Sequence, residues 1–185
     1  MDKLIEIIDS IWSSKKSDNY FAMLTSSVVL IDICASIEFH SNNYKPYKRY
    51  QKWVEDAIVP LIVEKNLTEY LEPVNFWFLR NSLLHEGSSN PNSNDQYQNF
   101  GEKKVRDIVP IANSTLDTKA FLVNDGFEYP VLMFDVVFFT ELVCEAANYW
   151  IKKNEEKIQA HSDNLFSIAL MANGKDGKAL IMRKK

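Results

Sequence analysis

Apolar residues recur at helical spacing through most of the first half of the chain. Proline suits the first turn of a helix, a serine or aspartate commonly caps one, and a wide apolar face marks a helix buried on several sides. On these criteria we expect four helices in this half of the chain. The first covers residues 3–13, and the second, which is central, is capped by Ser17 or Asp18 and runs to about residue 39. The third runs from Pro46 to about residue 60 or 65, and the fourth begins at Pro73.

The periodicity changes after a polar, turn-rich loop at residues 87–101. Residues 105–111 alternate as a strand does, and residues 121–123 and 127–133 flank an Asn-Asp-Gly turn, which is a hairpin signal. A last long helix is expected to begin near Asp135. Its predicted inner stripe consists of Phe139, Leu142, Ala146 and Tyr149. The pattern thus predicts a mainly α fold of four to five helices with a small β-hairpin insertion, at about residues 104–133, before the last long helix.

Charge separates this predicted domain, residues 1–160, from a basic tail, residues 161–185, where a second hairpin could form. From Gly174 onward five cations outweigh one acid, so this end carries +4, and the rest carries −8 of the total of −4. This balance argues against a generally basic nucleic-acid binder. If the protein binds RNA, it is expected to do so through a local patch.

The apolar runs do not predict a secreted or membrane protein. Acids interrupt the first apolar stripe, and the run from residue 20 to 31 ends at Asp32, short of the roughly 18–20 residues of a spanning helix. We therefore expect a cytoplasmic protein without membrane contact. Cys34 and Cys144 lie far apart and are expected to be buried small hydrophobes in a reducing compartment.

Several chemistries lack the residues that they need. None of the five glycines belongs to a phosphate-cradling loop. His40, His85 and His161 are too scattered for an obvious zinc site, and no cysteine pair supports one, so neither a metal nor a cofactor is expected. The run His161-Ser162-Asp163 is interpreted as the solvated end of the last helix.

The segment FLRNSLLHEG, residues 78–87, is the strongest candidate for chemistry. Cleaving a phosphodiester without a metal requires a group that moves protons, such as histidine, and a permanent cation that stabilises phosphate charge, such as arginine. Arg80 and His85 supply both, although five residues of α-helix separate them by roughly 140°. Asn81, four residues before His85, shares its face and could fix the imidazole's tautomer.

A purely structural interpretation of the same residues stays open. Here Arg80 pairs with a core acid such as Asp32, and His85 is a cation that ends its helix. Asp32 itself is expected either to face solvent or to pair with a cation in the core.

The run RNSLLHEG, residues 80–87, resembles the signature of the HEPN (higher eukaryotes and prokaryotes nucleotide-binding) superfamily: arginine, a polar residue, and histidine four to six residues after the arginine. The order of long helices, motif, loop or hairpin and closing helix is also similar, over about residues 1–158. The resemblance implies an up-down helical bundle and a homodimer with both motifs in one cleft. It often implies metal-independent endoribonuclease activity, in toxins or phage-defence effectors of which some pair with an antitoxin protein.

Carried to this sequence, the resemblance implies that Arg80 binds the scissile phosphate, His85 transfers protons and Asn81 positions them. The ribose 2′-hydroxyl would be the nucleophile, which restricts the substrate to RNA. Some members of the superfamily are inactive and serve as dimeric interaction or ligand-binding modules, which is the alternative function. A regulatory nucleic-acid binder that uses the basic tail is a third hypothesis.

A second, weaker pattern is NYKPYKRYQKW, residues 43–53. It interleaves Tyr44, Tyr47, Tyr50 and Trp53 with the candidate RNA-binding cations Lys45, Lys48, Arg49 and Lys52. Aromatic stacking surfaces and cations are what single-stranded RNA requires. The structural alternative is a core-facing aromatic stripe whose lysines extend to solvent.

Overall fold

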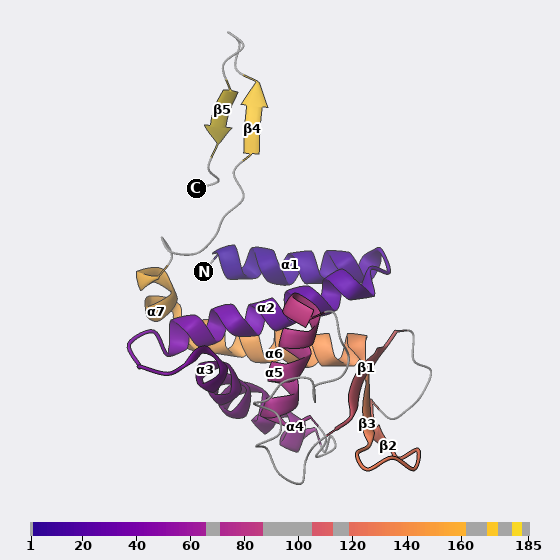
Figure 1. Cartoon of the computed structure of the whole chain (residues 1–185). Helices are drawn as coiled ribbons and strands as arrows, with labels where there is room; N and C mark the ends of the chain where they lie inside the picture. Colours follow the sequence, from indigo (N-terminus) through magenta and orange to yellow (C-terminus); the bar gives the residue numbers. More distant parts are fainter. Residues whose placement is uncertain are drawn as a thin grey trace.

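The computed structural model describes residues 2–65, 71–86, 105–112, 119–161, 170–173 and 179–182. Its helices are α1 (Asp2–Lys16), α2 (Tyr20–Glu38), α3 (Pro46–Trp53), η1 (Val54–Ile58), α4 (Val59–Glu64), α5 (Pro73–Asn81), η2 (Ser82–Glu86), α6 (Val136–Lys153) and α7 (Glu155–Ala160). Its strands are β1 (Asp107–Ile111), β2 (Ala120–Val123), β3 (Val131–Asp135), β4 (Leu170–Asn173) and β5 (Ala179–Met182). The fold is mainly helical with a small sheet, as the sequence predicts (Figure 1).

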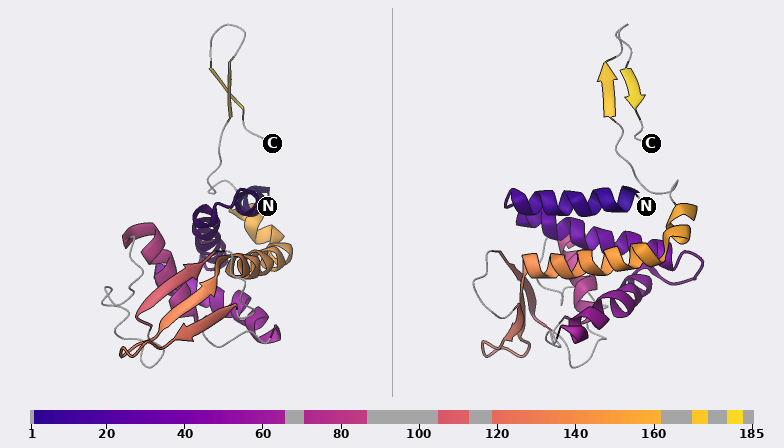
Figure 2. Two further views of the ribbon diagram at one scale, coloured as in Figure 1. Left: turned by 90° about the vertical axis from the view of Figure 1, so that its right-hand side faces the viewer. Right: turned by 180° about the vertical axis from the view of Figure 1, so that it is seen from behind.

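Helix α2 is the centre of the bundle. It contacts α1, α3, α5 and α6, and the views in Figures 1 and 2 show α1 and α6 running alongside it while α5 crosses it. Its cap is neither Ser17 nor Asp18 but Asn19, whose Oδ1 accepts a hydrogen bond from the backbone N–H of Ala22 at 3.1 Å. Asp18 instead takes a positive φ of 54° in the turn between α1 and α2.

By length and composition alone, α2 is also the one helix of the described residues that could cross a membrane, with a mean hydropathy of 1.8. Half of that window is buried inside the fold. Because a core helix passes the same test, and because other helices cover α2 on several sides, we interpret it as the core helix of the bundle.

Helix α6 follows directly from the sheet and packs along α2. Asp135, the last residue of β3, caps α6 by accepting a hydrogen bond from the backbone N–H of Phe138 at 2.8 Å. Between the helices, the buried hydroxyls of Ser27 and Thr140 lie 3.2 Å apart and are hydrogen-bonded. The predicted inner stripe is wrong at one position, because Tyr149 is 61 % exposed and the next residue, Trp150, is buried in its place.

The β insertion is a three-stranded sheet in the order β1-β3-β2. The predicted hairpin is present, since β2 pairs antiparallel with β3. What the pattern did not predict is that β1 pairs with β3 in parallel, so that β3 is central. Pro110 lies in β1, where its missing N–H is tolerated because β1 is an edge strand. The tail strands β4 and β5 pair antiparallel with each other.

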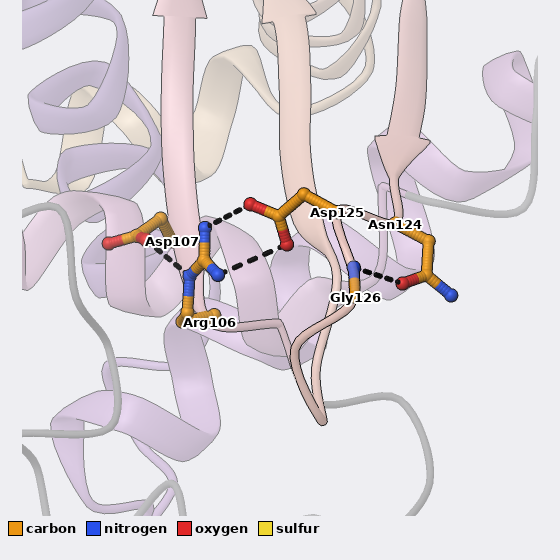
Figure 3. A network of polar contacts seen from close by, with 5 residues as sticks. All are labelled: Arg106, Asp107, Asn124, Asp125 and Gly126. Carbon is orange, nitrogen blue, oxygen red and sulfur yellow. Dashed lines mark hydrogen bonds and ion pairs between the residues drawn. The ribbon is translucent and has the colours of Figure 1, made fainter.

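An ion-pair network fixes the tip of this sheet (Figure 3). Both Nη atoms of Arg106 donate to the carboxylate of Asp125, at 3.1 and 2.8 Å, and its Nε donates to Asp107 at 3.0 Å. These bonds lower the pKa of Asp125, chiefly through the hydrogen bonds from Arg106. Gly126, at φ 91°, completes the turn and donates its N–H to Asn124. Arg106 therefore ties the start of β1 to the β2–β3 connection.

Phe139 lies where helix α6, helix α5 and strand β3 pack together. It is 1 % exposed, and its ring centroid lies 5.0 Å from that of Phe76 in α5 and 5.1 Å from that of Phe134 in β3. We expect Phe139→Ala to lower the free energy of unfolding by about 3–5 kcal/mol, since it removes a buried ring and leaves a cavity. Tyr149→Ala, on the exposed face of the same helix, should cost less than about 1 kcal/mol. Urea unfolding would measure both, and equal losses would contradict this role for Phe139.

The two cysteines provide a second test of the core. Both are buried, and burial raises the pKa of the Cys34 thiol and raises that of Cys144 to about 12. Because the thiolate is the reactive form, we expect neither to react with a thiol-specific disulfide reagent at pH 8 while the protein is folded. In denaturant both should react. Rapid labelling of the folded protein would place a cysteine at the surface.

Candidate functional site

Arg80 and Asp32 form an ion pair between α5 and α2. The Nε and Nη2 atoms of Arg80 both donate to Oδ2 of Asp32, at 3.1 and 2.7 Å. The two side chains are only 18 % and 22 % exposed. The structural interpretation of Arg80, pairing with a core acid, is therefore what the structure contains, and Asp32 pairs with a cation rather than facing solvent alone.

Two further contacts hold the guanidinium. Its Nη1 donates to Oδ1 of Asn81 at 3.1 Å, and its central carbon lies 5.2 Å from the ring centroid of Trp77, a cation–π contact. The side-chain amide of Asn81 thus binds Arg80. The sequence predicts instead that this amide orients His85. The arginine is fixed from three sides by side chains that the fold itself positions.

The helix changes form directly after Arg80 and Asn81. Residues 82–86 form a π-helical turn, η2, in place of the regular α-helix assumed from the sequence between Arg80 and His85. A π turn holds one more residue than an α turn, so the backbone at His85 is offset from Arg80 by a smaller angle than the roughly 140° of a regular α-helix. The side chain of His85, and Gly87 after it, lie outside the described residues, so the predicted convergence of the two side chains stays a prediction.

Tyr50, which the sequence assigned to the aromatic and basic pattern of residues 43–53, lies close enough to the Arg80–Asp32 pair to be influenced by both charges. It is fully buried, its ring lies 5.4 Å from that of Trp77, and its hydroxyl has no hydrogen-bond partner among the described residues. Burial raises the pKa of the Tyr50 phenol well above its ordinary value; Asp32 adds to the rise and Arg80 opposes it. The phenol therefore stays neutral beside the ion pair and cannot act as a base near neutral pH.

The aromatic part of the second pattern is mostly core. Tyr50 and Trp53 are fully buried, so they cannot stack on RNA, and the structural alternative holds for them. Tyr47 is half-buried against Trp77, with 6.5 Å between ring centroids. Tyr44 is 44 % exposed and lies against Phe39. Of the four predicted aromatic positions, Tyr44 therefore remains the one with a substantial exposed surface.

The four candidate cations differ in their surroundings. Lys45 and Lys48 are exposed and form no ion pair among the described residues. Lys52 pairs with Glu55 at 3.1 Å and with Asp56 at 2.9 Å. Arg49 is half-buried, and its Nε is enclosed without a partner. The two exposed lysines are thus the part of this pattern that is available to an anionic ligand.

An open groove of about 420 Å³ lies between α3, η1 and the start of α5. Its lining residues are Lys48, Gln51, Lys52, Glu55, Glu72, Pro73 and Val74. Cations and carboxylates thus share it, which does not favour binding of a polyanion along its length. Arg80 does not line this groove, so the structure does not join the two predicted patterns there.

No protein-family model matches this sequence, and neither a curated protein nor a solved structure matches it. The resemblance to the HEPN superfamily therefore remains a hypothesis that the motif and the helical fold suggest.

The Arg80–Asp32 pair generates a stability prediction. Asp32→Asn should lower the free energy of unfolding by about 1–3 kcal/mol, between the values for exposed and fully buried pairs, because it leaves a partly buried guanidinium without its charge partner. Glu141→Gln is the matched control, since it removes a more exposed interhelical pair with Lys15, 3.0 Å long, and should cost less than about 1 kcal/mol. Chemical denaturation would measure both. Equal effects would show that the Asp32 pair is no more important than a surface one.

Proposed function

We propose that this protein is a metal-independent endoribonuclease of the HEPN type, in which Arg80 and His85 act on one RNA phosphate. The observation that carries the proposal is the placement of Arg80. A permanent cation is held by Asp32, Asn81 and Trp77 at the end of α5, and a widened helical turn leads from it to a histidine. Such preorganisation of a cation is what transition-state stabilisation at a phosphate requires.

In this mechanism the ribose 2′-oxygen attacks the adjacent phosphorus and the bond to the 5′-oxygen of the next nucleotide breaks. A base takes the 2′-hydroxyl proton, and an acid gives a proton to the departing 5′-oxygen. The products are a 2′,3′-cyclic phosphate and a 5′-hydroxyl end. Arg80 stabilises the negative charge that builds on the phosphate oxygens, and His85 transfers a proton.

One histidine per motif cannot easily be acid and base in the same step, so we propose that the active form is a homodimer whose two-fold axis brings two motifs together. Lys45 and Lys48 are the proposed phosphate contacts outside the motif. A cytoplasmic toxin or phage-defence effector, with or without a partner antitoxin protein, is the biological role that this activity would fit.

The same ion pair favours one alternative, a non-catalytic dimeric interaction or ligand-binding module. Asp32 neutralises Arg80 in the structure, and a phosphate would have to compete with this carboxylate for two of the guanidinium N–H groups. Under this alternative, Arg80 is a structural cation that compensates an acid in the central helix.

Cleavage of mixed RNA in the presence of EDTA separates the two functions. We expect the wild type to cut RNA but not DNA, and to leave cyclic phosphate ends. His85→Ala should lower the rate by roughly 10²–10⁴-fold, the usual contribution of a proton-transfer group. Arg80→Lys should also lower it strongly, because it keeps a charge beside Asp32 but loses the planar fork.

His40→Gln is the control, since it removes an exposed histidine outside the motif, and its cleavage rate should equal that of the wild type. Circular dichroism would confirm that each variant is folded. An inactive wild type, or a His85→Ala variant that cleaves normally, would reject the nuclease and leave the binding module. Growth arrest on expression, relieved by His85→Ala, would give the same distinction in cells.

A further inference from the structure

Two of the three histidines of the chain meet at one end of the bundle. His40 follows the last turn of α2, and His161 follows α7, 121 residues later in the sequence. Their ring centroids are 4.4 Å apart, with an angle of 68° between the ring planes. The sequence gives no sign of this pair, because helix packing alone brings the two residues together.

The hydrogen bond of His161 fixes which of its nitrogens is available. Its Nδ1 lies 2.8 Å from the backbone carbonyl oxygen of Lys157. A carbonyl oxygen can only accept, so Nδ1 carries the hydrogen, and in the neutral ring the Nε2 lone pair points away from this bond. A backbone carbonyl that holds the second ring nitrogen is the usual support of a metal-binding histidine.

The surroundings of the pair are compatible with a cation. His40 is exposed, and its ring forms no hydrogen bond among the described residues. The neighbouring ammonium of Lys157 is paired with Oε1 of Glu38 at 2.8 Å, and the other oxygen of that carboxylate accepts from Trp150 Nε1 at 2.7 Å. The positive charge nearest in sequence to His161 is thus already balanced.

The spacing of the rings also fits a shared ion. With metal–nitrogen distances of about 2.0–2.1 Å and an angle near 90–110° at the metal, two imidazoles have centroids about 4.5–5.2 Å apart. The observed distance of 4.4 Å lies just below this range. No group of three or more histidine, cysteine or acidic side chains arranged for a metal exists among the described residues, so water would complete the coordination.

We propose that His40 and His161 bind one divalent transition-metal ion of the class that prefers imidazole, such as Zn²⁺. Because His40 lies at the end of α2 and His161 at the end of α7, the ion would link these two helices. His40 is eight residues beyond Asp32, about 12 Å along a helix, so the site is separate from the Arg80 network and does not depend on the proposed cleavage of RNA.

Titration of the full-length, tag-free protein with ZnCl₂ in a calorimeter tests the proposal. We expect one Zn²⁺ per chain for the wild type, and at least a tenfold weaker affinity for both His40→Gln and His161→Gln, because each removes one of two protein ligands. The control is His85→Gln, which changes the remaining histidine and should bind Zn²⁺ as the wild type does. Thermal unfolding should show the same order, with a Zn²⁺-dependent rise in Tm only where both histidines remain.

Absence of binding by the wild type would overturn the proposal, and so would unchanged affinity in His40→Gln. Loss of binding in His85→Gln would place the ion elsewhere and would overturn it as well. Should His161→Gln prove unfolded, His40→Gln still decides, since that side chain is exposed and bonded to no backbone group. The RNA cleavage assay is independent of this result, because it is performed with EDTA and with His40→Gln as a control.

Discussion

Asp32 places a carboxylate in the middle of the central helix, and the rest of the bundle is arranged so that this charge is compensated. Helix α2 is covered on several sides, so an unpaired acid there would be costly. Arg80 meets that need from α5, with Asn81 and Trp77 supporting its guanidinium. The pair therefore orients α5 against α2, and every chemical role proposed for the motif begins from an arginine already placed by the fold.

The same constraint explains why the ion pair does not by itself distinguish an enzyme from a binding module. A partly buried pair of this kind fixes geometry more reliably than it adds stability. Fixed geometry is what a nuclease needs of its cation, and it is also what a helix interface needs of a structural one. The group that would distinguish the two functions is His85, since a structural arginine does not require a histidine five positions later.

Local patterns predicted the parts of this protein that depend on local physics. The helical spacing and the two prolines located α3 and α5, and the Asn-Asp-Gly turn located the β2–β3 hairpin. Asp32 paired with Arg80 was foreseen as an alternative, because a charge in so apolar a helix needs a partner. Tyr149 was misassigned because a stripe at spacing three and four can pass through either of two adjacent positions, and packing against α2 chose Trp150.

Features that depend on long-range packing could not be predicted from local sequence patterns. Nothing in residues 105–111 indicates parallel pairing with β3, and the π turns of η1 and η2 have no composition that distinguishes them from α-helix. The His40–His161 contact belongs to the same class, because its two members come from helices that are distant in sequence. Helix α2 takes part in both contacts: Asp32 within it binds Arg80, and His40 just beyond its end lies against His161, the residue after α7. One central helix thus has a polar residue within it, Asp32, and another just beyond it, His40. Each contacts a residue far away in the sequence, and hydrophobic periodicity alone does not identify either partner.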